Sequence, residues 1–504
     1  MTTTEREIKL SPPAAFRLPP LTDPGGGVFA SPESTATLVA TYYDTDDLRI
    51  TRFGASLRYR DPEGWTVKLP HGDGDDEMLA RDEHHVSGEQ GTPPEGALDL
   101  VRSLTRGLPV APVATLSTSR TTVRLHDSQG RGVGEVVDDA VEGTFPDPDP
   151  LAGPVRFDEV EVELSEAATD THRAAILARL RSAGAGPVDP TPKIVRALGV
   201  PATRPADVEV PELGDTFPTV EAVTVRAIAS SVHRLVAYDP TARLGADPEG
   251  VHQARVATRR LRSDLRTFGS VLNEPWTTGL RDELRWLGDV FGAVRDADVL
   301  FERLEAKVQL LPDVDRAPAK RILDHLRSDE ARGREQLLRA LRSERYDALL
   351  DRLVGAAARP RFLPRVDGAD DVEVLRRVVR RPWQKLADAI EALGDDPSDL
   401  GLHGVRIRAK SARYAAEAVA PAFGKPARAY ARAVTRLQDV LGAHQDAVVA
   451  AEWLRRAGAN AADEATGFAA GQLAAFEHRE ADRARRAWPD AWRRASRKRL
   501  RTWL

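Results

Sequence analysis

The chain has 504 residues and no cysteine, which excludes a disulfide framework, a thiolate metal site and a cysteine nucleophile. Its 72 Lys and Arg residues nearly balance 77 Asp and Glu residues, but residues 1–200 hold 20 bases against 32 acids, whereas residues 201–504 hold 52 against 45. No apolar stretch approaches the roughly 20 residues of a membrane-spanning helix, and the N-terminus lacks the pattern of a signal peptide. We therefore expect a cytoplasmic protein without a membrane partner.

Short β-branched or alternating runs dominate residues 1–200, and clusters of Gly, Pro and Asp separate them. These runs predict eight strands, at 5–10, 36–44, 55–60, 64–70, 78–86, 114–126, 132–141 and 157–164. Two other segments, 96–107 and 171–184, have the apolar spacing of helices. Many strands with a few helices fit an antiparallel barrel or sandwich.

Ionised side chains alternate along nearly every predicted strand, and alternate residues of a strand share one face. The residues that share such faces are Glu5, Glu7 and Lys9; Arg58 and Arg60; Thr66 and Lys68; Arg81 and Glu83; Arg120, Thr122 and Arg124; and Glu159, Glu161 and Glu163. A barrel that turns these faces to water explains any single strand. It explains less well why nearly every strand adds residues of the types that bind phosphate.

The alternative is that the charged faces turn inward. The barrel then encloses a tunnel with about eight basic groups and several carboxylates, and buried charges of this kind need partners. We expect such a lining to be unstable when empty. A polyphosphate with divalent cations would supply both partners, since phosphates bind Arg and Lys while cations bind carboxylates.

The segment EREIKL is similar to the E-x-E-x-K signature of the CYTH superfamily, the triphosphate tunnel enzymes. The segments YYDTDDLRI, SLRYR, TVKLP and EVEVEL follow the order of the family's motifs, and the match covers about residues 3–200. The resemblance implies an eight-stranded antiparallel tunnel that binds linear triphosphates together with Mg²⁺ or Mn²⁺.

The resemblance also implies roles for individual residues. Glu5, Glu7 and Lys9 look like the catalytic set, and the implied metal ligands are Glu5, Glu7, Asp138, Glu159 and Glu161. The implied substrate-binding residues are Lys9, Arg58, Arg60, Lys68, Arg81, Arg120, Arg124 and Lys193. Two alternatives stay open: whether Asp138 or Asp139 faces the tunnel, and whether the working acidic pair is Glu159/Glu161 or Glu161/Glu163. Thr191 and Pro192 precede Lys193, where the family usually has a Ser-Lys pair.

Phosphoryl transfer needs mainly positioning and charge neutralisation, so no covalent nucleophile is required. A carboxylate such as Glu5, Glu159 or Asp138 could orient the attacking water. The sequence nominates no other acceptor, so we expect a metal-dependent hydrolase of inorganic triphosphate. The alternatives are a non-catalytic polyphosphate-binding scaffold, and a thiamine or nucleoside triphosphatase or adenylyl cyclase.

The chain changes character after residue 200. Residues 201–218 carry four prolines and few large apolar side chains, which indicates a linker. Residues 219–504 are rich in Ala, Leu and Arg with helical periodicity, which predicts an all-helical domain. This domain contains a repeat, because 251–266 parallels 402–417 and 287–298 parallels 437–448.

The repeat duplicates a row of bases. His252, Arg255, Arg259 and Arg262 align with His403, Arg406, Lys410 and Arg413, and on a helix such spacing forms one stripe. Like charges so close repel unless an anion neutralises them. Four repeated acids are either internal partners of the bases or groups that cap helices and orient the His and Arg side chains: Asp289, Asp296, Asp439 and Asp446.

The two repeated blocks resemble the CHAD domain, over about residues 219–490. The resemblance implies two pseudo-symmetric four-helix bundles around a basic groove that binds inorganic polyphosphate, without catalysis, and an association with polyphosphate granules would follow. The basic stretch 483–504 predicts either a solvated closing helix or a contact with a polyanion or nucleic acid, since its bases interleave with Trp488, Trp492 and Trp503, and nothing else indicates recognition of nucleic acid bases. The fold class expected for the whole chain is therefore α+β, with an N-terminal β-tunnel and a C-terminal pair of helical bundles.

Overall fold

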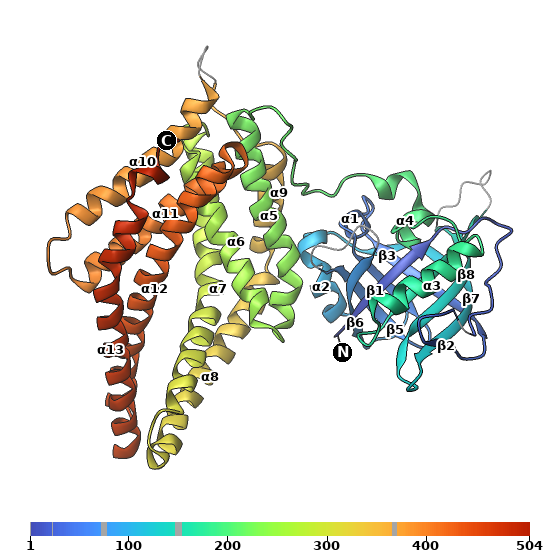
Figure 1. The fold of residues 1–504 in the computed structure, drawn as a ribbon, viewed down its shortest axis with the longest axis horizontal. Helices are drawn as coiled ribbons and strands as arrows, with labels where there is room; N and C mark the ends of the chain where they lie inside the picture. The colour runs from blue at the N-terminus through green and yellow to red at the C-terminus, as the bar shows by residue number, and fades with distance from the viewer. Residues whose placement is uncertain (1, 23, 72–77, 147–153, 365–369) are drawn as a thin grey trace. The chain divides into compact units, whose positions relative to one another are not determined.

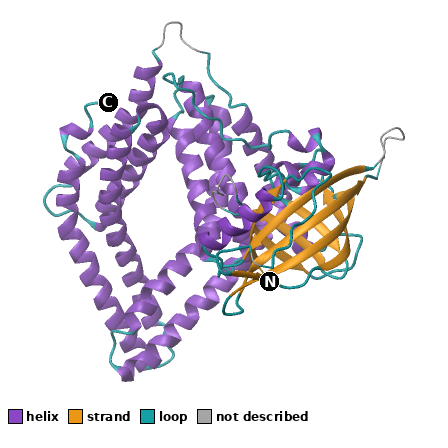
Figure 2. Cartoon of the chain, turned by 45° about the vertical axis from the view of Figure 1, so that its right-hand side comes forward, coloured by secondary structure: helices purple, strands orange, loops and turns teal. Residues whose placement is uncertain are grey.

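The structure is a computed structural model that describes residues 2–22, 24–71, 78–146, 154–364 and 370–504. The chain divides into two compact units, Met1–Asp207 and Val208–Leu504. Every strand of the described residues lies in the first unit, and the described part of the second unit is helical (Figures 1 and 2). No described helix is long and apolar enough to cross a membrane.

The first unit is built on one antiparallel sheet that closes on itself. Its strands are β1 (Thr2–Leu10), β2 (Val28–Ala30), β3 (Ser34–Asp44), β4 (Ser56–Arg60), β5 (Gly64–Pro70), β6 (Leu79–Val86), β7 (Ala111–Asp127), β8 (Gly132–Thr144) and β9 (Val155–Leu164). Eight of them form a barrel in the order β7-β3-β4-β5-β6-β1-β9-β8, and pairing of β7 with β8 closes it. The predicted eight-stranded antiparallel barrel is therefore confirmed. The short β2, which was not predicted, pairs with the end of β7.

The strand register brings the charged faces of neighbouring strands together. Lys9 in β1 lies opposite Glu161 in β9, and Asp139 in β8 lies opposite both Glu159 in β9 and Arg120 in β7. The other face of these strands is apolar. There Ile8, Leu10, Val136, Val160 and Val162 form one core with Ile176, Leu177 and Leu180 of helix α3 (Asp170–Ser182). Because this core holds the outer face against a helix, the charged faces turn inward.

Three further helices complete the first unit. Helices α2 (Glu95–Thr105) and α3 confirm the two predicted helical segments. The short α1 (Arg49–Arg52) and α4 (Lys193–Leu198) were not predicted, and a 3₁₀ turn follows at Val200–Thr203. Helix α4 places Ile194 and Ala197 against Leu116 and Val141 of the barrel, and this packing positions Lys193 at the first residue of the helix.

The second unit consists of long helices joined by short loops. They are α5 (Val220–Leu244), α6 (Pro248–Thr267), α7 (Glu274–Val308), α8 (Asp313–Leu341), α9 (Glu344–Ala358), α10 (Asp371–Glu391), α11 (Asp399–Phe423), α12 (Lys425–Ala459) and α13 (Glu464–Ala495). Helices α5–α8 and α10–α13 form the two predicted four-helix groups, and α9 packs on α5 and α7. The repeated sequence blocks fall on α6 and α7 in the first group and on α11 and α12 in the second.

The beginnings of these helices follow directly from the sequence. The side chains of Asp247, Asn273, Ser398 and Asp463 accept hydrogen bonds from backbone N–H groups in the first turns of α6, α7, α11 and α13. Such caps satisfy donors that have no partner within a helix. Helices α7, α8, α12 and α13 meet in an apolar core that contains Leu304, Leu326, Leu454 and Leu473. This core therefore joins the two repeats to each other.

Candidate functional site

The barrel encloses a cavity of about 450 Å³ with a largely charged wall. All eight bases that were predicted to bind substrate line it: Lys9, Arg58, Arg60, Lys68, Arg81, Arg120, Arg124 and Lys193. Carboxylates share the wall, from Glu5, Glu7, Glu63, Glu83, Glu135, Glu161 and Glu163. The cavity can therefore bind both anions and cations.

One group of three carboxylates lies where β8 and β9 pair. Asp139, Glu159 and Glu161 are buried, and one oxygen from each lies within 4.8 Å of the others. Lys193 Nζ lies 2.6 Å from Asp139 Oδ2 and 2.9 Å from oxygens of both glutamates. Arg120 donates two hydrogen bonds to Asp139, at 2.9 and 2.7 Å, and a third to Glu161 at 2.9 Å. Lysine and arginine charges thus neutralise this group directly.

Lys9 completes this arrangement. Its ammonium group donates to Glu159 at 3.2 Å and to Glu161. Burial by itself raises the pKa of Glu161, but the charges of Lys193, Lys9 and Arg120 outweigh it and hold that pKa well below its usual value. At Glu159 burial prevails and raises the pKa of the carboxyl. Glu159 Oε2 is buried without a hydrogen-bond partner in the described part of the chain.

A second group of three carboxylates, Glu5, Glu7 and Glu163, lies on β1 and β9. Lys68 Nζ donates to both oxygens of Glu5, at 2.8 and 2.6 Å, and Arg81 donates to Glu7. Glu163 has weaker compensation, since its nearest base in the described residues, Arg120, is 3.9 Å away. Burial, together with the charges of Glu161 and Glu5, raises the pKa of Glu163 to about 7.

Most charged groups of this lining are therefore paired with one another. The physical reason is the register, because it places each buried carboxylate within reach of a base on a neighbouring strand or on α4. Any phosphate that enters must take bases away from carboxylates, and the released carboxylates become available to cations.

The structure decides between the two adjacent aspartates of β8 and corrects the prediction of Asp138 as a metal ligand. Asp138 pairs with Val160 on the outer face, whereas Asp139 pairs with Glu159 on the inner face. Asp139 therefore contacts Arg120 and Lys193 inside the barrel. The residues of both alternative acidic pairs of β9 belong to the carboxylate groups. Glu159 and Glu161 are members of one group, and Glu163 is a member of the other.

Tyr42 lines the cavity from β3 and was not among the predicted site residues. Its phenol is buried; although burial raises the pKa, the charges of Arg58 and Lys193 outweigh it and lower the pKa of Tyr42. The same face of β3 carries the apolar residues Leu38 and Ala40, so the sequence has no alternation of charged residues there that would have pointed to Tyr42. Unlike the buried Tyr42, Arg124 is 81% exposed at its side chain, so it lies on the cavity wall and contacts solvent as well.

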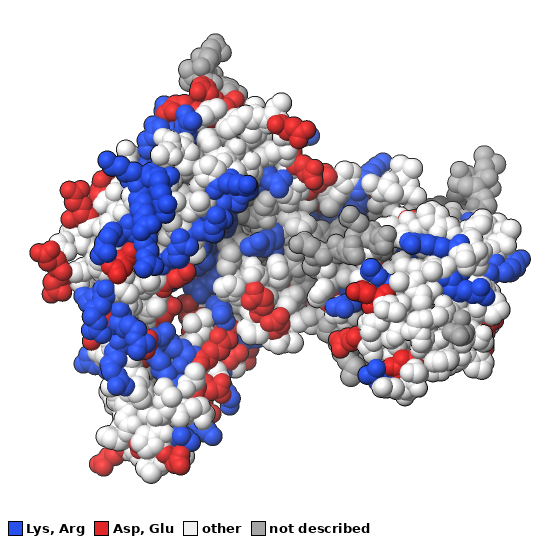
Figure 3. All heavy atoms as spheres, in the orientation of Figure 1, with Lys and Arg blue, Asp and Glu red and all other residues white. Residues whose placement is uncertain are grey.

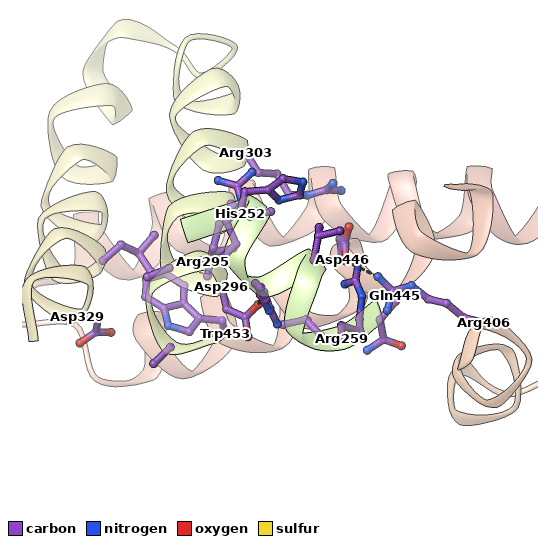
Figure 4. A pocket seen from close by; sticks show the side chains of 18 of the residues that line it. His252, Arg259, Arg295, Asp296, Arg303, Asp329, Arg406, Gln445, Asp446 and Trp453 are labelled. Atoms are coloured by element: carbon purple, nitrogen blue, oxygen red, sulfur yellow. Dashed lines mark hydrogen bonds and ion pairs between the residues drawn. The ribbon is translucent and has the colours of Figure 1, made fainter. Parts of the chain in front are cut away.

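The helical unit contains a second, larger cavity of about 630 Å³, lined by residues of α6, α7, α8, α11 and α12 (Figure 4). Its bases are His252, Arg255, Arg259, Arg295, Arg303, Arg406 and Lys410. Five of these belong to the predicted stripes, and Arg295 and Arg303 come from α7. In the space-filling view, Lys and Arg gather in a band on the displayed face of this unit (Figure 3).

Three residues of the predicted stripes lie outside the lining of this cavity. Arg413 lies 3.6 Å from Glu417 and stacks on the ring of Tyr414. Arg262 lies among other arginines, and burial together with the charge of Arg285 lowers its pKa. His403 Nδ1 is buried and has no hydrogen-bond partner in the described residues.

The repeated aspartates divide into two kinds. Asp296 Oδ1 lies 2.7 Å from Arg255 Nη1, and Asp446 Oδ1 lies 3.7 Å from the equivalent Arg406 Nη2, so these two are internal partners of the stripes. Asp289 and Asp439 are exposed and form no ion pair within the described ranges. All four lie well inside α7 and α12, which excludes the helix-capping alternative.

The bases of the helical cavity are less well compensated than those of the barrel. Arg259 donates to the hydroxyl of Tyr414 at 2.9 Å, and neither Arg259 nor Lys410 has a carboxylate within 4 Å in the described part of the chain. Burial and the charges of Arg406, Arg259 and Arg255 lower the pKa of Lys410 to about 7. An anion in the cavity would relieve this repulsion.

Arg303 of α7 is held in place by hydrogen bonds to α13. The buried carboxylate of Glu477 in α13 accepts hydrogen bonds from its Nε and Nη2, the latter at 2.6 Å. Lys307 donates to the same carboxylate at 2.6 Å. Arg303 Nη1 donates no hydrogen bond within the described residues, so this atom can contact a ligand in the cavity.

The sequence matches the CYTH domain over residues 1–192 and the CHAD domain over residues 226–455. The uncharacterised protein Rv2226 of Mycobacterium tuberculosis is 33% identical over 473 residues, which cover 90% of this chain and 88% of that protein. Among solved structures, PptA from Streptomyces chartreusis is 25% identical with a TM-score of 0.47, covering 55% of this chain and 100% of the other. The CHAD domain from the plant Ricinus communis is 27% identical with a TM-score of 0.45, covering 56% of this chain and 95% of the other.

Proposed function

We propose that this chain, which belongs to the proteins that join a CYTH domain to a CHAD domain, hydrolyses inorganic triphosphate in its barrel and binds polyphosphate in its helical unit. The observation that supports catalysis most strongly is the barrel cavity itself, where eight bases line the wall together with Glu5, Glu7 and Glu163 of one carboxylate group and Glu161 of the other. This combination suits an anion that arrives with divalent cations.

The carboxylate groups fit a divalent cation such as Mg²⁺ or Mn²⁺. Each group offers three oxygens within 4.8 Å of one another, and oxygen ligands are what these ions prefer. Glu159 Oε2 is buried and accepts no hydrogen bond from the described residues, so it is available as a ligand for a cation. The Asp139, Glu159 and Glu161 group and the Glu5, Glu7 and Glu163 group would hold the ions. When bound, such ions would supply Lewis-acid neutralisation of the phosphate oxygens.

The bases of the wall would bind and position the triphosphate. Lys9, Lys193 and Arg120 would exchange their carboxylate partners for phosphate oxygens, and Arg58 and Lys68 would bind the chain further along the wall. Their fixed positions neutralise charge that develops on the transferred phosphoryl group. Glu5 is a suitable residue to orient the attacking water, because its side chain is 14% exposed whereas Glu159 is fully buried.

The reaction balances as a hydrolysis. The water oxygen forms a bond to the terminal phosphorus, and the bond from that phosphorus to its bridging oxygen breaks. Orthophosphate and pyrophosphate leave, and the water proton passes through the carboxylate to solvent. No residue of the cavity needs to form a covalent bond.

The helical cavity supports polyphosphate binding through its bases. Six lysine and arginine side chains line it, and two of them have no carboxylate partner among the described residues. Chain phosphates would bind Arg255 and Arg406 in competition with Asp296 and Asp446. The pseudo-symmetry of the two stripes suits a linear polyphosphate, because its identical units can contact both stripes in the same way.

The test is phosphate release from tripolyphosphate, ATP and thiamine triphosphate, each with Mg²⁺, with Mn²⁺ and with a chelator. We expect metal-dependent turnover that is fastest on tripolyphosphate. Preference for either organic triphosphate would instead identify a thiamine or nucleoside triphosphatase, and cyclic AMP from ATP would identify a cyclase. Polyphosphate binding without turnover on any substrate would leave only the scaffold function.

A further inference from the structure

The helical cavity is chemically uneven along its wall. One part carries the stripe bases Arg255, Arg259, Arg406 and Lys410, from α6 and α11. Another part is apolar and comes from α7, α8 and α12, where the lining residues are Val299, Leu300, Leu326, Val449 and Trp453. Figure 4 shows Trp453 and Asp329 on one side of the cavity and Arg406 and Gln445 on the other.

Trp453 is placed to offer one face to a ligand. It is half-buried on α12 and packs against the apolar core shared by α7, α8, α12 and α13. Trp453 also lines the cavity, as does Leu300, which packs on the same core. An indole fixed in this way stacks well on a flat ring and loses little conformational entropy when it does so.

A second cavity, of about 490 Å³, shares Trp453 and Asp329 with the first. Two of its lining residues, both exposed, have a side-chain polar atom for which the described residues supply no hydrogen bond. His325 Nδ1 lies 2.9 Å from the carbonyl oxygen of Arg321, which leaves its Nε2, and Asn460 Nδ2 donates to the carbonyl oxygen of Arg456 at 3.0 Å, which leaves its Oδ1. These polar groups therefore line the same second cavity as Trp453.

Inorganic polyphosphate uses only part of this site. It has no apolar surface, so contact with Leu300, Leu326 and Trp453 would remove water from its charges without compensation. An alkyl chain would use the apolar part but would bring no anion to the bases Arg255, Arg259, Arg406 and Lys410. A nucleoside polyphosphate suits both parts, since its phosphates match the bases and its nucleobase has a stacking face and a polar edge.

We propose that the helical cavity binds a nucleoside polyphosphate, with the phosphates on Arg255, Arg259, Arg406 and Lys410 and the base stacked on Trp453. This proposal rests on the proposed binding of phosphate chains by the same bases. It adds a ligand class, because the apolar part of the cavity then recognises a nucleobase.

The experiment uses the full chain and 8-azidoadenosine triphosphate, with peptide mass spectrometry to locate the photolabel. Because the label is mapped, nucleotide bound in the barrel is counted separately. We expect labelling of α12 around Trp453, or of α8 around His325, and loss of this label when long-chain polyphosphate competes for the bases.

Substitutions of Trp453 give the quantitative test. Trp453→Leu keeps an apolar side chain but removes the stacking face, and we expect about tenfold weaker half-saturation of the helical label. Trp453→Phe retains a ring and should restore labelling to within about twofold. The matched control is Trp286→Leu, since Trp286 is a half-buried tryptophan that stacks on Arg345 away from the cavity. It should leave the label unchanged.

Polyphosphate affinity separates the two proposals. We expect Trp453→Leu to bind long-chain polyphosphate as the parent chain does. If polyphosphate binds but the helical unit takes no label, or Trp453→Leu labels normally, the nucleoside proposal is wrong and polyphosphate binding stands. If the parent chain does not bind polyphosphate at all, the proposed function of the helical unit is wrong.

Discussion

The two cavities of this protein bring bases together in opposite ways. In the barrel, Lys9, Lys193 and Arg120 contact buried carboxylates at hydrogen-bond distance. In the helical cavity, Arg406 is 3.7 Å from its aspartate, and Lys410 has no carboxylate within 4 Å among the described residues. The barrel is therefore charge-balanced without a ligand, whereas the helical cavity holds excess positive charge. We infer that ligand binding is an exchange of partners in the barrel and a relief of repulsion in the helical unit.

The largest expected effect is the loss of turnover when a carboxylate charge is removed from the barrel cavity. Glu7→Gln keeps the shape of the side chain but removes the charge that faces Arg81 and Lys9. We expect kcat for tripolyphosphate to fall on the order of 100-fold or more, since charge stabilisation at the reacting centre is lost. Phosphate release under saturating substrate measures it.

Asp138→Asn is the matched control for this substitution. It removes one carboxylate from the same barrel, but from the outer face. Turnover within about twofold of the parent chain is expected. Equal loss in both variants would show that the carboxylates act through folding and not through the cavity.

The next effect concerns the stripes of the helical unit. Arg255→Ala/Arg406→Ala removes one base from each repeat, and we expect polyphosphate affinity to fall at least tenfold while tripolyphosphate hydrolysis is retained. The affinity of the parent chain should also fall steeply with salt, because the contacts are ionic. Titrations at several salt concentrations measure both. Unchanged affinity in the double variant would refute binding at the stripes.

A smaller effect is the pH dependence of the helical cavity. Because the pKa of Lys410 is lowered to about 7, the side chain loses its proton above that pH in the free cavity. A bound polyanion favours the charged form, so binding takes up a proton and affinity should fall as pH rises from 7.5 to 9, by up to about tenfold per unit. In Lys410→Met this slope should disappear. A slope that persists in the variant would assign the proton to another group.

The smallest effect is on stability and has the opposite sign from the effect on function. Lys410 has a lower pKa in the folded chain than in the unfolded one, so the unfolded state binds more protons between about pH 7 and 10.5, and stability rises with pH in that window. At pH 7, Lys410→Met should therefore stabilise the ligand-free protein, by about 1 kcal/mol. Thermal unfolding measures it, and a destabilised variant would contradict the model of excess charge.

Much of the site could be predicted because it depends on local patterns. Alternation along a strand groups Glu5, Glu7 and Lys9 on one face whatever the sheet does, and the repeat pairs Arg255 with Arg406 without any knowledge of packing. Residues without such a pattern were missed. Tyr42 lies on an apolar face of its strand, and Trp453 and Arg303 reach the helical cavity from helices outside the basic stripes.

The sequence by itself determined the two units, their fold classes and which residues share a strand face or a helix stripe, because these depend on periods of about two and 3.6 residues. Only the tertiary structure decided which face of the barrel turns inward. Two aspartates that are adjacent in the chain, Asp138 and Asp139, ended on opposite sides of the wall because closure of the sheet and the apolar core under α3 fix the inner face. The tertiary structure likewise decided which bases have partners, because Lys193 meets Asp139, Glu159 and Glu161 only when α4 packs onto the closed barrel.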